Sequence, residues 1–228
     1  MSRLEQILER LERFYGVLPS PPSDPFQLFV WESLSTHTTP RRRDAAYAAL
    51  KRLRALTPDA MWRVSQLKLE ATVALAGPYV EQRLRSLRAG VDLFRRHPDL
   101  PNTIRGPVAA ALKALKPLPR MSGDSGAYRM LLFAGAHPVM PVDAGVWRTA
   151  VRLGYGQSTG NFKQSARTVR QSLAGELPSG LAAYRQAYLY LSHHGAVTCT
   201  QANPHCVVCP VLTECSEGQQ RTRPLQIY

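Results

Sequence analysis

Residues 194–215 read HGAVTCTQANPHCVVCPVLTEC and contain all four cysteines of the chain. Their spacing is Cys199-x6-Cys206-x2-Cys209-x5-Cys215. Four thiolates this close together can hold a tetrahedral zinc ion or an iron–sulfur cluster. A zinc site with four cysteine ligands usually has two short Cys-x2-Cys pairs, whereas this stretch has one pair with longer arms. The spacing therefore favours a bulkier cluster over zinc, and it disfavours four unrelated core cysteines.

The composition is that of a globular protein with an unusual charge. The 228 residues suffice for one large domain or two small ones. Hydrophobic residues make up 44% and charged residues 20%, but the formal net charge is +13. A chain this basic usually binds a polyanion, first of all nucleic acid, although arginine-rich composition alone gives the same charge.

No segment resembles a secretion signal or a membrane span. Residues 1–18 are predicted to form an amphipathic helix that contains acids, unlike a leader. No apolar run approaches the ~20 residues that cross a bilayer. We expect a cytoplasmic, nucleoid-associated monomer without a membrane partner. Disulfides are not expected there, so the cysteines need another role.

Helix-start signals recur along the chain. Asp24-Pro25, Thr39-Pro40 and Thr57-Pro58 each combine a capping side chain with a proline at the first helical position. A basic helix is predicted from about Val80 to His97. No stretch alternates apolar and polar residues as a strand does. The sequence therefore predicts an all-α fold.

A later helix carries an apolar face of Tyr184, Ala187, Tyr188 and Leu191. Glycine commonly ends a helix, so this helix is predicted to stop at Gly195.

The cysteine spacing, together with His194-Gly195 before it and Cys209-Pro210 within it, resembles the [4Fe–4S] loop of endonuclease III and its adenine-excising relatives. These are helix-hairpin-helix DNA glycosylases, and the resemblance extends through most of the chain. It implies a structural [4Fe–4S] cluster held by Cys199, Cys206, Cys209 and Cys215. It also implies two lobes: residues 22–132, ending in the helix-hairpin-helix, and residues 1–21 plus 133–228, holding the cluster. The substrate cleft would lie between them.

One departure from the family concerns the loop between the first two cysteines. Family members often carry basic residues there, but residues 200–205 read TQANPH, without Lys or Arg. The resemblance therefore gives no support to phosphate contact by this loop.

The second family signature is a hairpin of the type Leu-Pro-Gly-Val-Gly-Arg-Lys-Thr-Ala, followed about 18 residues after its lysine by Val-Asp. Here Val142-Asp143 fits, and counting back without gaps lays residues 119–127 over the hairpin. Gly123 keeps the second hairpin glycine, Met121 replaces the first, and Asp124 adds an acid. Glycines at such a turn let backbone N–H groups approach a phosphate. The alternative is a plain helix–turn–helix corner.

The same alignment suggests which residues contact DNA. The hairpin and the arginine five residues after the aspartate supply most of them, and the position where the family fills the gap left by a flipped nucleotide supplies one more. The set is Arg120, Gly123, Gly126, Arg148 and His37. Arg83, Arg85, Arg88, Arg95 and Arg96 crowd the basic helix, and some of these should also face DNA.

Asp143 is the expected catalytic residue. Breaking an N-glycosidic bond builds positive charge on the sugar, and a fixed carboxylate stabilises that charge or activates water. The alternative is that Asp143 only caps the following helix, and both can hold.

Ser125 occupies the position of the lysine with which bifunctional family members form a Schiff base. A hydroxyl cannot form an iminium, so lyase activity is expected to be weak or absent. Lys113 and Lys116 lie just upstream and are expected to face solvent.

Glu32 stands five residues before His37, where the adenine-excising branch has a glutamate that protonates the departing base. Partial burial would suit Glu32 to that acid role, and the alternative is a charge on the flank of a helix. Glu32 and Ser125 are therefore further candidate catalytic residues.

The expected function is that of a DNA glycosylase acting on duplex DNA. One alternative is the adenine-excising branch, although its extra C-terminal domain is missing. Another is a module that binds damaged DNA without cleaving it, and a zinc-binding regulator is the third.

Overall fold

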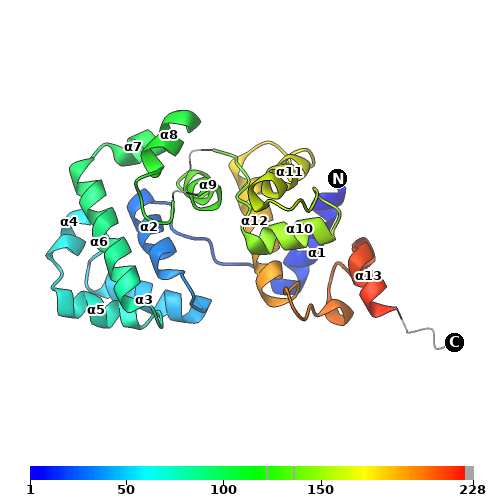
Figure 1. The fold of residues 1–228 in the computed structure, drawn as a ribbon, viewed down its shortest axis with the longest axis horizontal. Helices are drawn as coiled ribbons and strands as arrows, with labels where there is room; N and C mark the ends of the chain where they lie inside the picture. Colours follow the sequence, from blue (N-terminus) through cyan, green and yellow to red (C-terminus); the bar gives the residue numbers. More distant parts are fainter. Residues whose placement is uncertain (122, 136, 224–228) are drawn as a thin grey trace. The chain divides into compact units, whose positions relative to one another are not determined.

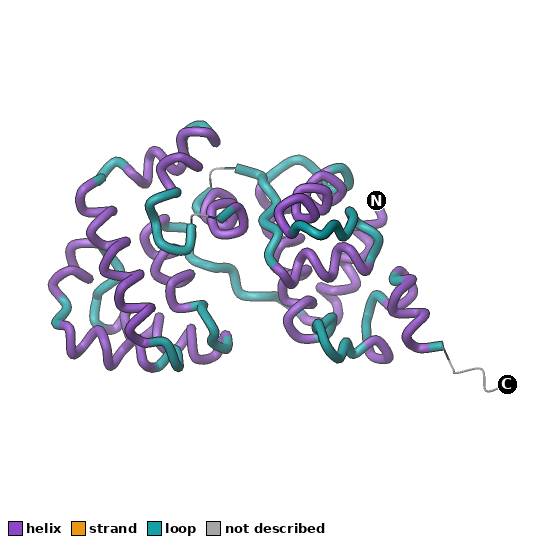
Figure 2. The backbone as a smooth tube through the Cα atoms, in the orientation of Figure 1, coloured by secondary structure: helices purple, strands orange, loops and turns teal. Residues whose placement is uncertain are grey.

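The computed structural model describes residues 1–121, 123–135 and 137–223, and most of them are helical (Figures 1 and 2). No strand occurs within these ranges, which confirms the predicted all-α class. None of the described helices is both long and apolar enough to cross a membrane.

The chain forms two compact units. One consists of Pro21–His137 and is called here the continuous unit. The other combines Met1–Ser20 with Pro138–Tyr228 and is called the split unit. Asp143 and the cysteines are in the split unit, whereas Glu32, His37 and the hairpin are in the continuous unit.

The continuous unit contains eight described helices. They are α2 (Pro25–Leu34), α3 (Pro40–Arg52), α4 (Pro58–Arg63), α5 (Gln66–Ala74), α6 (Val80–Arg96), α7 (Leu100–Arg105), α8 (Val108–Leu115) and α9 (Asp124–Phe133). The predicted starts are confirmed for α2, α3 and α4. Asp24, Thr39 and Thr57 each accept a hydrogen bond from the backbone N–H three residues on.

Helix α2 is buried between its neighbours, and a glycine makes this possible. An ideal Cβ on Gly90 of α6 would lie 2.0 Å from Cζ of Phe29, so only glycine lets α6 approach this ring. Phe26 packs edge-on against Phe94 of α6, with ring centroids 5.2 Å apart. The contact fixes the helix on which Glu32 lies.

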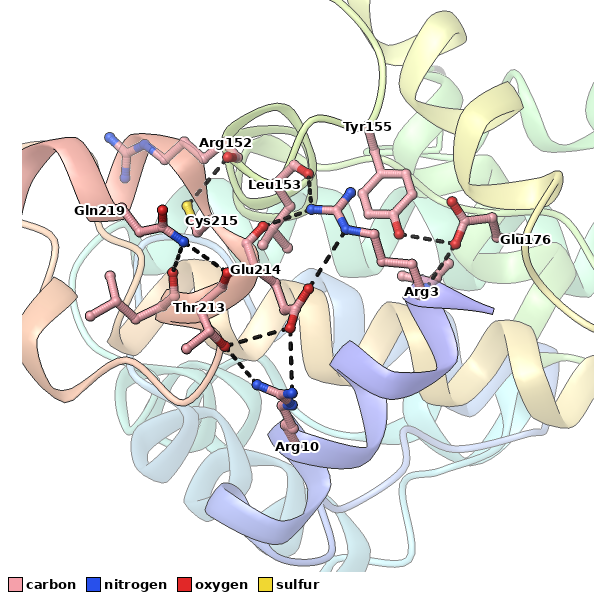
Figure 3. Close-up of polar contacts among 12 residues, drawn as sticks. Arg3, Arg10, Arg152, Leu153, Tyr155, Glu176, Thr213, Glu214, Cys215 and Gln219 are labelled. Atoms are coloured by element: carbon pink, nitrogen blue, oxygen red, sulfur yellow. Dashed lines mark hydrogen bonds and ion pairs between the residues drawn. The ribbon is translucent and has the colours of Figure 1, made fainter. Parts of the chain in front are cut away.

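The split unit is built from α1 (Arg3–Tyr15), α10 (Ala144–Arg152), α11 (Phe162–Ala174), α12 (Leu181–Val197) and α13 (Ser216–Thr222), with short 3-10 turns at Cys206–Val208 and Leu212–Glu214. Helix α1 is tied to the cysteine-rich loop by arginines (Figure 3). Arg3 donates to the carbonyl of Glu214 at 2.6 Å, and Arg10 donates to the hydroxyl of Thr213 at 2.7 Å.

Helix α12 continues to Val197, so the predicted end at Gly195 is wrong. The reason is a contact with α10. An ideal Cβ on Gly195 would lie 2.5 Å from the carbonyl oxygen of Gly145, which no side chain could tolerate. Gly195 therefore serves the close approach of two helices and does not terminate one.

Candidate functional site

Asp143 lies at the N-cap of α10, and three donors hold its carboxylate. Oδ1 accepts a hydrogen bond from the backbone N–H of Val146 at 2.8 Å. Oδ2 accepts from the hydroxyl of Tyr188 at 3.0 Å and from that of Ser192 at 2.9 Å. The expected capping role is present, and it occupies only one oxygen of the carboxylate. The group is half-buried and fixed, as a carboxylate that stabilises a developing cation must be.

Glu32 is buried, with 3% of its surface exposed, and is paired with an arginine that the sequence analysis did not single out. Arg129 of α9 donates from Nε to Oε1 at 2.8 Å and from Nη2 to Oε2 at 2.6 Å. This is a side-on, bidentate ion pair. Both oxygens of Glu32 are therefore occupied as acceptors of hydrogen bonds from Arg129. The geometry therefore favours an electrostatic role for Glu32 over the expected acid role.

Ser125 joins the same group of residues. Nη1 of Arg129 donates to the hydroxyl oxygen of Ser125 at 2.8 Å, because the two residues lie one turn apart on α9. Glu32 and Ser125, which are distant in sequence, are thus linked through one guanidinium. The two upstream lysines, Lys113 and Lys116, are exposed.

The predicted hairpin lies between α8 and α9. An ideal Cβ on Gly126 would lie 2.2 Å from the carbonyl oxygen of Arg120, so glycine is required for the turn to pack on the first helical turn of α9. Gly123 is the N-cap of α9, and Arg120 adopts a left-handed φ of 68°. Ser122 lies outside the described residues, as does the side chain of Asp124, whose expected charge effect is therefore not described.

Arg120 lies near the Glu32–Arg129 pair. Although part of its side chain is exposed, desolvation of the guanidinium lowers the pKa of Arg120 below its ordinary value. Glu32 opposes this shift and Arg129 adds to it. One carboxylate thus shares its surroundings with two guanidinium groups.

His37 and Tyr79 form an exposed aromatic pair in the continuous unit. Their ring centroids are 5.0 Å apart. Both residues have left-handed backbones, with φ of 43° and 67°, a conformation that costs free energy in residues other than glycine. The expected DNA contact of His37 therefore has a neighbouring ring that the sequence analysis missed.

Arg83 is buried and binds the backbone segments that precede His37 and Tyr79. It is 1% exposed, and its guanidinium donates to the backbone carbonyls of Thr36, Ala76, Gly77 and Pro78. These carbonyls immediately precede His37 and Tyr79, so one buried cation restrains both strained positions.

Most of the other arginines of α6 are also engaged within the unit. Arg88 donates to the carbonyl of Val64 at 2.9 Å, and Arg95 pairs with Asp59 at 2.9 Å. Arg96 pairs with Asp92, while Arg85 makes only a long, exposed contact with Glu81 at 3.7 Å. Arg83 is buried and saturated with protein acceptors, so it does not face DNA as the crowded sequence suggested.

Arg148 connects α10 to the start of the cysteine-rich loop. Its Nε donates to the carbonyl of Cys199 at 2.7 Å, and Nη2 donates to that of Gly195. These bonds give Arg148 a structural task next to the cysteines. Contact with DNA remains a prediction for this residue.

The four cysteines line one cavity in the split unit, and none of them forms a disulfide. Leu153, Val211 and Leu212 contribute apolar walls. Burial raises the pKa of the Cys209 thiol to about 11, and the three other cysteines add to this rise. Arg152 donates to Sγ of Cys199 at 3.3 Å and pairs with Glu217 at 3.1 Å. The thiols thus line a common, largely apolar space.

Comparison with known proteins identifies the fold. No model of a known protein family matches the chain. The chain is 26% identical over 212 residues to "Endonuclease III" of Treponema pallidum (strain Nichols), which covers 91% of this chain and 93% of that protein. A solved structure of a trapped endonuclease III–DNA covalent intermediate is similar, with a TM-score of 0.70, 23% identity, and coverage of 98% of this chain and 100% of that one. The chain thus has the helix-hairpin-helix glycosylase fold, and its sequence is similar to that of endonuclease III. A thermostable thymine-DNA glycosylase is also similar, with a TM-score of 0.71, 18% identity and 95% coverage of both chains.

The cysteine cavity of this endonuclease III-like chain can be tested against a [4Fe–4S] cluster. Among the described residues, no group of three or more Cys, His, Asp or Glu side chains is placed to hold a metal ion. In a four-iron cluster each cysteine binds a different iron, so the ligands must surround a space instead of converging on one point. The four thiols do line a common space, and thiolates are the ligands that such clusters use. The four cysteines therefore fit the ligand requirements of a cluster. Binding of a cluster by this chain is a proposal.

Besides Tyr79, other side chains near the candidate residues were not identified from the sequence. Arg129 had only one local signal, its position one turn after Ser125. Tyr188 was read as part of an apolar face, and Ser192 was not noticed. Arg83 was named only as one of five arginines on the basic helix, some of which were expected to face DNA. Each of these side chains acts through a partner distant in sequence, which periodicity cannot identify.

Proposed function

We propose that this endonuclease III-like protein is a base-excision DNA glycosylase. It binds duplex DNA and cleaves the N-glycosidic bond of a damaged or mispaired base. The observation that carries the proposal is the carboxylate of Asp143, held by three donors at the start of α10. Positive charge develops on the sugar as the bond breaks, and such a preoriented carboxylate stabilises it or activates the attacking water.

The proposed enzyme has little or no lyase activity. Ser125 stands where bifunctional relatives carry a lysine, and its hydroxyl accepts a hydrogen bond from Arg129. Strand cleavage through a Schiff base needs a primary amine, which neither a serine nor a guanidinium supplies. Excision of the base would therefore leave an intact strand with an abasic site.

Cys199, Cys206, Cys209 and Cys215 are proposed to hold a [4Fe–4S] cluster. When bound, the cluster supplies structural cross-linking of the loop. Arg148 and Arg152 hold the same loop through its backbone carbonyls, at Cys199 and Thr200. These residues orient the loop from the split unit's own helix α10, next to Asp143.

A panel of labelled duplexes tests the proposal. It holds oxidised pyrimidines, adenine opposite oxidised guanine, mispaired thymine, uracil and an abasic site, under single-turnover conditions, with half of each reaction treated with hot alkali. Strand breaks only after alkali are the expected result. Breaks without alkali would contradict the absence of lyase activity.

A second candidate function is a module that binds damaged DNA without hydrolysing it. Two observations favour it: the uncharged residues 200–205, and the pairing of Glu32 with Arg129 instead of a free acid. The pairing also weighs against the adenine-excising alternative. Asp143→Asn separates the two functions, because loss of base release with retained DNA binding supports the enzyme. If the native protein binds the duplexes tightly but releases no base from any of them, the result supports the non-hydrolysing DNA-binding function.

A further inference from the structure

The carboxylate of Asp143 receives two donors that capping does not require. A helix N-cap needs one side-chain oxygen to accept from a backbone N–H, and Oδ1 already does so. The hydroxyls of Tyr188 and Ser192 both donate to the other oxygen, Oδ2. The two residues are four positions apart on α12, so their side chains leave the helix on one face.

Ser192 differs from Ser33 and Thr72, two other hydroxyl residues within helices. Each of these donates to the carbonyl four residues earlier in its own helix, at 2.8 Å. That bond is one that Ser and Thr inside a helix can make. Ser192 instead directs its hydroxyl across to α10, which indicates that the carboxylate of Asp143 is its preferred acceptor.

Helices α10 and α12 approach each other closely at two glycines, Gly145 and Gly195. An ideal Cβ on Gly145 would lie 3.1 Å from the carbonyl oxygen of Ser192 and 3.2 Å from Oδ1 of Asp143. Gly195 is packed even more closely on Gly145. Two glycines thus bring the hydroxyl-bearing face of α12 within hydrogen-bond distance of the carboxylate.

We propose that Tyr188 and Ser192 are positioning residues for Asp143. They fix the plane of its carboxylate, and therefore the direction in which its charge acts on the sugar. Without them the cap bond to Oδ1 would be the remaining restraint from these three donors, and rotation about Cβ–Cγ, a broadly populated torsion, would shift both oxygens more freely. Preorganisation of this kind matters because a charge that must reorient during the reaction stabilises the transition state less. The inference rests on the proposed glycosylase function.

The first test uses Tyr188→Phe and Ser192→Ala in the purified holoprotein. On the duplex that the panel identifies, each substitution is expected to slow single-turnover base release about tenfold, the usual effect of one hydrogen bond to a charged group. Binding of the same duplex should change by less than about twofold. Ser192→Thr keeps the hydroxyl and should restore most of the rate. Tyr190→Phe is the matched control, because its hydroxyl donates to the carbonyl of Gly16 from the same helix.

Asp143→Asn distinguishes positioning from general support of the fold. In that background, Tyr188→Phe and Ser192→Ala should cause no further loss of rate, since their target charge is gone. The same loss in both backgrounds, or no loss in the native background, overturns the inference while the proposed function stands.

A second measurement does not depend on turnover. Duplexes carrying a cationic pyrrolidine abasic analogue and a neutral tetrahydrofuran are compared by their Kd values. The native protein should prefer the cation, because it mimics the charge on the sugar, and both variants should lose about tenfold of that preference. Retention of the full preference in both variants overturns the inference. A native protein with neither base release nor cation preference overturns the proposed function and the inference with it.

Discussion

Replacing Arg129 by Met should destabilise the protein by about 3 kcal/mol. The substitution removes the guanidinium that forms the bidentate ion pair with the Glu32 carboxylate, whose side chain is 4% exposed, while the side chain of Arg129 is 16% exposed. Leaving one charge of a buried pair uncompensated costs about 3–5 kcal/mol, and the partial exposure of Arg129 places this case at the low end. For a chain of this length, the loss corresponds to a Tm lower by about 6–12 °C.

Urea unfolding followed by circular dichroism measures the loss, with thermal melting as a second readout. Glu32→Gln combined with Arg129→Met removes the charge as well as its partner, and should recover most of the lost stability. Arg85→Met is the matched control on an exposed ion pair with Glu81 and should change stability little.

Two results would refute this reasoning. The first is an Arg129→Met variant no less stable than the Arg85 control, which would mean that water solvates Glu32. The second is a double variant as unstable as the single one, which would mean that the methionine disturbs packing and that charge is irrelevant.

Two further predictions concern other parts of the molecule. Arg83→Met removes the donors to four backbone carbonyls that restrain His37 and Tyr79. It should weaken duplex binding, measured by fluorescence anisotropy, more than tenfold. Unchanged affinity would show that the aromatic pair does not bind DNA. Cys209→Ser should lower the iron and acid-labile sulfide content per chain. It should also lower the Tm, because a bound cluster contributes folding free energy. A native protein that holds one zinc ion and no iron would contradict the cluster.

The local features of this fold could be read from the sequence. The starts of α2, α3 and α4 depend on a capping side chain and the proline after it, and both are adjacent in the chain. Asp143 as a helix cap is equally local. These capping interactions form within one helical turn, so they do not depend on which other elements the helix packs against.

Gly195 shows where local reasoning ends. Glycine is common just after a helix, and it is also common where two helices touch, and the sequence does not distinguish these uses. Only the position of Gly145, fifty residues earlier, decides between them. The same limit hid the roles of Tyr188 and Ser192, whose acceptor Asp143 lies on another helix.

Arg129 changes how the missing lysine is understood. Ser125 stands at the lysine position, and the guanidinium of Arg129 donates to its hydroxyl at 2.8 Å. This cation stays protonated under physiological conditions, so it keeps a positive charge at this place without supplying a nucleophilic amine. Its charge is also balanced by Glu32, which a free lysine at position 125 would have to share. The serine–arginine–glutamate group therefore offers a hydroxyl and a paired guanidinium at this place, and neither supplies the primary amine that a Schiff base needs.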